Sequence, residues 1–150
     1  MRIILISVGV VKGKSPYQDL FHTYLKRMQW SVDAVEIDTR KFSTQDAQCD
    51  KILDYLNEPG GYVVALDERG KTLGSQDFSD KMSQLQMDNL SSVTFIIGGA
   101  DGLTKAVRQK ADFLMSFGKQ TWPHQMVRVM LIEQIYRAQQ ILAGHPYHRE

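Results

Sequence analysis

Short apolar runs alternate along this chain with segments whose apolar side chains recur at helical spacing. The runs predict strands at residues 2–8, 32–37, 62–66, 93–97 and 113–117. The other segments predict helices at residues 16–28, from 43 or 44 to 59, 75–90, 103–111 and 126–142. Continuous Ile- and Val-rich runs are typical of buried parallel strands. The alternation therefore predicts an α/β fold in which helices sandwich a mostly parallel sheet.

Turn-forming residues mark the expected boundaries of these elements. Ser43 or Thr44 is placed to cap the second helix, and the Pro-Gly-Gly run at 59–61 to end it. We expect a polar turn at 67–70 after the third strand. Because no linker or internal repeat interrupts the pattern, residues 1–150 are predicted to form a single domain.

The final predicted helix is apolar over more than one face. Its apolar residues are Val127, Val129, Met130, Leu131, Ile132, Ile135 and Ile141. Covering one side of a sheet would not use all of them, so we expect a second contact, made by another copy of the chain.

Composition narrows the class of protein. The 150 residues are 43% hydrophobic and 23% charged, as in ordinary globular proteins. No apolar run is long enough to cross a bilayer, so we expect no membrane partner. The single cysteine, Cys49, lies in a predicted helix and suits a reducing, cytoplasmic location.

The formal net charge of +1 argues against generic binding to naked nucleic acid. Local basic faces remain compatible with it. One candidate face contains Lys12, Lys14, Lys26 and Arg27, and another contains Lys105, Arg108 and Lys110. The alternative is that these charges are simply solvated.

Ligands of open parallel sheets bind beyond the carboxyl ends of the strands. Three segments should meet there, at residues 66–67, 98–102 and 118–124. The adjacent Gly98 and Gly99 would let the backbone approach a flat ligand and adopt positive φ. The alternative is a tight turn capped by Asp101. Neither the G-x-G-x-x-G pattern nor a P-loop lysine is present, so a phosphate site is poorly supported.

Several polar side chains outside the glycine segment are candidates for chemistry. The backbone of the loop 118–124 would surround an adenine, with Trp122 forming one wall of the site. The alternative is that Trp122 anchors a core or an interface. Arg128 would bind phosphate or substrate, or pair with Glu133. Glu133 and Arg137 have the spacing of a helix-surface ion pair. The histidines lack an accompanying carboxylate or cysteine cluster, so no metal is expected.

Four ordered segments resemble the RlmH-type ribosomal RNA methyltransferases of the SPOUT class. They are IGGADGL at 97–103, PHQMVRV at 123–129, EQIYRA at 133–138 and the tail HPYHRE at 145–150. The resemblance spans the whole chain, although residues 42–60 match only in general character. Ala100-Asp101 stands where many members carry Pro-Glu, which leaves the role of Asp101 open.

The resemblance implies a C-terminal trefoil knot, a homodimer packed through the final helix, and S-adenosylmethionine as cofactor. It implies that the cofactor is held, mainly by backbone groups, at Leu66, Gly98, Phe117, Gly118, Lys119, Gln120, Thr121 and Trp122. It also implies methylation of N3 of a pseudouridine in 23S rRNA on the assembled ribosome.

The tail supplies candidates for the chemistry that this activity requires. The acceptor N3–H must lose its proton, which a neutral histidine or a bound water would take. We expect His148 as base or orienter, Tyr147 to stack on or hydrogen-bond the base, and Arg149 to hold phosphate or the developing oxyanion. His145 and His124 are alternative substrate-binding groups.

All of these roles require the tail to fold back beside the Gly98-Gly99 bend, within one subunit or across the pair. The competing hypothesis is a non-enzymatic α/β module that binds a nucleotide and signals through its dimer. That module would use the glycine bend but leaves the tail unexplained. A histidine-based hydrolase is disfavoured because no nucleophile elbow is present.

Overall fold

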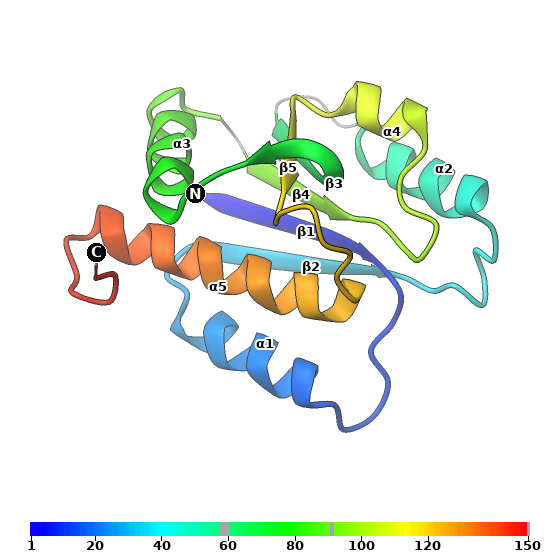
Figure 1. Cartoon of the computed structure of the whole chain (residues 1–150), viewed down its shortest axis with the longest axis horizontal. Helices are drawn as coiled ribbons and strands as arrows, with labels where there is room; N and C mark the ends of the chain where they lie inside the picture. Colours follow the sequence, from blue (N-terminus) through cyan, green and yellow to red (C-terminus); the bar gives the residue numbers. More distant parts are fainter. Residues whose placement is uncertain (58–60, 91, 150) are drawn as a thin grey trace.

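The structure is a computed structural model that describes residues 1–57, 61–90 and 92–149. Figure 1 shows the described elements in chain order. The strands are β1 (Arg2–Val8), β2 (Ser31–Ile37), β3 (Gly61–Thr72), β4 (Ser92–Ile97) and β5 (Phe113–Ser116). The helices are α1 (Pro16–Arg27), α2 (Gln45–Tyr55), α3 (Ser75–Met87), α4 (Lys105–Lys110) and α5 (His124–Leu142).

The strands form a parallel sheet in the order β2-β1-β4-β3-β5. In its centre, Leu5 of β1 pairs with Ala34 of β2 on one side and Phe95 of β4 on the other. Because all the strands run the same way, their carboxyl ends lie along one edge. The predicted α/β fold with a parallel sheet is confirmed.

Helices cover both faces of the sheet (Figure 1). On one face, α1, α3 and α5 bury Phe21, Phe78 and Ile132 against the strands. On the other face, α2 and α4 contribute Cys49 and Val107 to a second core. Because the helices lie on the two faces of the sheet, the carboxyl ends of the strands are left uncovered between the two helix layers. In the described ranges, no helix has the length and hydrophobicity needed to cross a membrane.

The structure decides between the two predicted caps of α2 and moves the start of α5. Thr44 rather than Ser43 caps α2, since its side chain accepts a hydrogen bond from the Ala47 N–H at 3.1 Å. The start of α5 was placed too late, because Pro123 is the N-cap residue and His124 is already helical. α2 ends at Tyr55 with Leu56 as its C-cap, earlier than the predicted stop at Pro59-Gly60-Gly61, of which Pro59 and Gly60 lie outside the described residues.

The predicted polar turn at 67–70 is wrong, because β3 continues through it to Thr72. Both Leu66 and Lys71 pair with Met115 of β5, so the residues between them form a bulge. A Cβ at Gly70 would lie 2.6 Å from the backbone of Leu114 and Met115. Glycine therefore allows the bulged strand to stay against β5.

Candidate functional site

A cavity of about 800 Å³ opens beside the bulge of β3, at the ends of β4 and β5 and the beginning of α5. It is large enough for a nucleoside-sized ligand. Most of the residues predicted to hold a cofactor line it, namely Leu66, Gly98, Phe117, Gly118, Gln120, Thr121 and Trp122. Lys119 is exposed and is not among the lining residues. Parallel strand ends thus bring together three segments that are far apart in the chain.

The glycine bend after β4, formed by Gly98 and Gly99, packs closely against neighbouring parts of the same chain. A Cβ at Gly98 would lie 3.0 Å from Leu103 Cδ2, and one at Gly99 would lie 2.9 Å from Val8 Cγ1. The expected positive φ is wrong for this pair and occurs instead at Gly102 and Gly118. Gly98 and Gly99 therefore allow the bend to pack closely against Leu103 and Val8. The left-handed backbone conformations occur at Gly102 and Gly118, which also line the cavity.

Side chains from other elements hold the segment 99–104 in place. Gln45 of α2 donates from Nε2 to the Asp101 carbonyl at 2.7 Å. Arg108 of α4 donates to the Leu103 carbonyl, and both Gln45 and Arg108 line the cavity. The predicted cap by Asp101 is wrong, since Thr104 is the N-cap of α4 and makes no side-chain cap bond.

The loop between β5 and α5 forms the opposite wall. Ser116 Oγ donates to the Gly118 carbonyl at 2.7 Å and accepts from the Gly118 N–H at 3.1 Å. Trp122 lines the cavity with 37% of its surface exposed, so it is not a core anchor within the subunit. The Trp122 indole gives this wall a flat apolar surface, and the backbone around Gly118 places polar main-chain groups beside it.

The bulge in β3 places the carboxylate of Asp67 at the rim of the cavity. The sequence alone indicates no role for this side chain. The Asp67 side chain is only 5% exposed. It accepts hydrogen bonds from the Arg69 N–H at 2.9 Å and from Arg69 Nη1 at 3.2 Å. These hydrogen bonds fix residues 67–69 within the bulge of β3, beside the cavity.

The first turns of α5 carry two of the predicted substrate-binding residues. His124 lines the cavity. Arg128 is 6% exposed, forms an ion pair with Glu36 of β2, and stacks over the Phe21 ring at 4.1 Å. The alternative pairing of Arg128 with Glu133 is therefore wrong. The pair with Glu36 fixes the beginning of α5 to the sheet.

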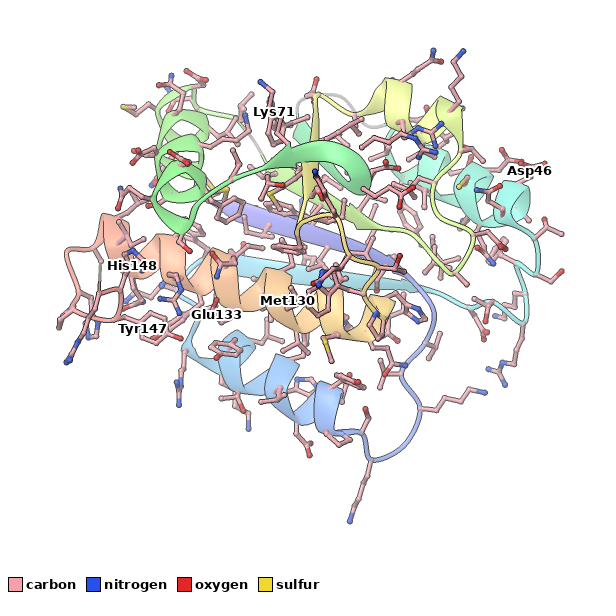
Figure 2. The ribbon with its side chains drawn as sticks, viewed as in Figure 1. Asp46, Lys71, Met130, Glu133, Tyr147 and His148 are labelled. Atoms are coloured by element: carbon pink, nitrogen blue, oxygen red, sulfur yellow. The ribbon has the colours of Figure 1, made fainter. Side chains whose placement is uncertain are left out.

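The tail folds back on the far end of α5 in its own subunit (Figure 2). Tyr147 donates from its hydroxyl to Glu133 Oε1 at 3.1 Å and packs edge-on against Tyr136. Arg137 forms the predicted ion pair with Glu133 and contacts His148 Nδ1 at 3.2 Å. Burial, followed by hydrogen bonding with Tyr24 and Glu133, raises the pKa of Tyr147. The tail is therefore docked through a neutral phenol.

The tail does not reach the cavity within one subunit. The 19 residues of α5 span about 28 Å at about 1.5 Å per residue, with His124 at one end and the tail at the other. Figure 2 shows Tyr147 and His148 at the end of the molecule opposite Asp46 of α2. Convergence within one subunit is contradicted, which leaves convergence between two copies.

The remaining tail residues also lie at this distal end. His145 is exposed and donates its N–H to the Gln140 carbonyl at 2.9 Å, and Arg149 is exposed. Glu150 lies outside the described residues. Among the side chains that the structure describes, no group of three or more His, Cys, Asp or Glu is placed to hold a metal ion.

Comparisons with known proteins agree on one family. A family model described as a predicted SPOUT methyltransferase matches residues 1–148. A protein from Rhodospirillum centenum named ribosomal RNA large subunit methyltransferase H is 45% identical over 153 aligned positions, covering 99% of both chains. A protein of the same name from Paramagnetospirillum magneticum is 42% identical, again covering 99% of both chains.

The fold also has a counterpart among solved structures. The structure of a probable methylase family protein from Haemophilus influenzae covers 99% of this chain and 70% of its own, with a TM-score of 0.56 and 11% identity. At this identity the likeness concerns the fold alone.

Proposed function

The chain belongs to the SPOUT methyltransferase family, and we propose that it methylates large-subunit ribosomal RNA. The finer proposal is that it transfers a methyl group from S-adenosylmethionine to N3 of a pseudouridine in 23S rRNA. The acceptor lies on the assembled ribosome, so the protein works in the cytoplasm. The gathering of the predicted cofactor residues around one cavity is the observation that carries this proposal.

The cavity fits S-adenosylmethionine by size and chemistry. Its volume of about 800 Å³ exceeds that of a nucleoside, and Leu66, Phe117 and Trp122 give it apolar walls for a flat base. Backbone groups at Gly98 and Gly118 supply polar contacts that tolerate side-chain variation. When bound, the cofactor supplies an activated methyl group, and the protein needs chiefly to align the acceptor with it.

The tail is proposed to carry the groups that act on the acceptor. His148 takes the N3 proton directly or orients a water that does, and Tyr147 stacks on or hydrogen-bonds the base. Arg149 holds phosphate or the oxyanion that develops. His145 and His124 are alternative substrate-binding groups, and His124 already lies at the cavity. Arg128 is proposed to act on substrate indirectly, since its guanidinium is held by Glu36.

We propose a homodimer in which α5 packs against α5 of a second copy. The face of α5 beside α1 carries the half-buried Val129 and Met130, and with the exposed Leu20 of α1 they surround a hollow of about 500 Å³. An antiparallel two-fold pairing brings the tail end of one α5 to the beginning of the other. The tail of each copy then lies beside the cavity of its partner. The trefoil knot stays a prediction of the family resemblance.

A nucleotide-binding module without enzymatic activity is the second candidate. It would use the same cavity, and calorimetry separates the two functions. Binding of S-adenosylmethionine favours the methyltransferase, whereas binding of nucleoside phosphates alone favours the module.

Removal of residues 147–150 tests the role of the tail. We expect the shortened protein to fold and to bind S-adenosylmethionine, because the tail is remote from the cavity of its own subunit. We expect it to transfer no methyl group to 23S rRNA, as measured by mass spectrometry of ribosomes incubated with each protein. Retained methylation would rule out the tail as the source of the catalytic groups.

A further inference from the structure

Two connections beside the cavity carry a cluster of exposed cations. Residues 9–15 join β1 to α1, and residues 38–44 join β2 to α2. Figure 1 shows both connections at the end of the sheet from which α5 begins. They present the exposed side chains of Lys12, Lys14, Arg40 and Lys41.

The two connections form one surface. The Gly9 N–H donates to the Ile37 carbonyl at 2.8 Å, so the first connection begins against the end of β2. The pKa of Asp38 is lowered to about 2, first by hydrogen bonds from Arg40 and also by the charge of Lys12 in the other connection. The two loops therefore begin side by side, at the ends of the adjacent strands β1 and β2.

The charge of this surface is strongly positive. Asp38 is the only carboxylate in residues 9–15 and 38–44, all of which the structure describes, and it is already paired with Arg40 at 2.8 Å. Among the described residues, Lys12, Lys14 and Lys41 have no carboxylate within ion-pair distance. Three lysines are thus left to attract anions in a protein whose net charge is only +1.

The surface adjoins the cavity on two sides. A Cβ at Gly9 would lie 3.0 Å from Nε2 of His124, which lines the cavity. Gln48 donates from Nε2 to the Phe42 carbonyl at 2.9 Å, while its Oε1 would lie 3.2 Å from a Cβ at Gly99. A chain of phosphates lying on the two loops would therefore pass next to the glycine bend.

Other arginines and lysines are less suited to this task. Arg128 and Arg137 are held in ion pairs with glutamates, and Lys81 lies over the rings of Tyr62 and Phe113. The predicted grouping of Lys12 and Lys14 with Lys26 and Arg27 is not seen. Lys26 and Arg27 lie in the last turn of α1, which is the end away from the cavity.

We propose that residues 9–15 and 38–44 form a phosphate-binding surface on which ribosomal RNA lies as it presents its acceptor base to the cavity. This inference rests on the proposed function. Lysine contacts to phosphate position a nucleic acid without reading its sequence. The surface accordingly supplies affinity and orientation, while the cavity and the partner's tail supply the chemistry.

The salt dependence of binding tests the surface. The triple variant K12A/K14A/K41A removes exposed lysines without breaking an ion pair between described residues. Each lost phosphate contact makes the negative slope of log K against log salt shallower by about 0.7 to 0.9, so we expect the slope to become less negative by about 2 to 3 in total. Binding of the protein to large ribosomal subunits would be measured between low and physiological salt.

The control is K51A/K71A, which removes two lysine charges outside both candidate basic faces and breaks no ion pair between described residues. We expect its slope to equal that of the wild type, and both variants to bind S-adenosylmethionine as the wild type does. If K12A/K14A/K41A shows an unchanged slope and still methylates ribosomes, the phosphate-binding surface is refuted while the proposed function stands. If the wild type neither binds nor methylates large subunits, the proposed function fails, and the surface falls with it.

Discussion

At the scale of single residues, the ion pair between Arg128 and Glu36 is the most informative contact in this protein. The Arg128 side chain is 7% exposed and that of Glu36 is 23% exposed. The pair joins α5 to β2 one turn after His124, which lines the cavity. Charged groups are retained at such depth only where a partner compensates them, so the beginning of α5 depends on this contact.

Replacement of Glu36 by Gln measures that dependence. The substitution leaves the Arg128 guanidinium charged and buried without its counter-ion, and we expect a loss of about 2 to 4 kcal/mol in the free energy of unfolding. The control is D33N in the exposed pair of Arg2 and Asp33, for which we expect less than about 1 kcal/mol. Urea unfolding curves give both values, and equal losses would contradict a structural role for Arg128.

At the scale of elements, the bulge in β3 shapes the rim of the cavity. It allows residues 67–69 to leave the ladder and line the site, while Lys71 and Thr72 rejoin β5. Gly70 makes this possible, because any side chain would meet the backbone of β5.

The variant G70A tests the bulge. A Cβ placed 2.6 Å from the Met115 backbone forces β3 and β5 apart, and we expect a loss of about 1 to 3 kcal/mol together with weaker binding of S-adenosylmethionine. G74A is the control, since a Cβ there would meet only the flexible side chain of Asp77 at 3.3 Å. Unfolding curves and calorimetry give the two quantities. A G70A protein as stable as G74A would show that the bulge tolerates a side chain.

Sequence patterns predicted the elements where one periodicity dominates. The strands at β1 and β4 are continuous apolar runs, and both were predicted within one residue of their bounds. The second half of β3 was missed because it is polar and bulged, which resembles a turn. The partners of Gln45, Gln48 and Arg128 were missed because residues far apart in the chain carry no shared signal in a single sequence.

At the scale of the whole molecule, the cavity and the tail lie at opposite ends of α5. The cavity is lined by the bulge of β3, the segment after β4 and the loop after β5, and most of the positions implied by the family resemblance are among the lining residues. The position of the tail could not be predicted, because its contacts with Glu133, Tyr136 and Arg137 carry no signal in a single sequence. The proposed symmetric pair with antiparallel α5 helices would bring the two parts together.

Complementation between two inactive variants tests the central claim, that each site combines the cavity of one copy with the tail of another. One variant lacks residues 147–150, and the other carries T121W to fill the cavity, with loss of S-adenosylmethionine binding checked by calorimetry. We expect neither to methylate 23S rRNA alone. After random mixing, half of the dimers are hybrids with one complete site each, so we expect about a quarter of wild-type activity. A co-expressed mixture that forms hybrid dimers but stays inactive would contradict the shared site.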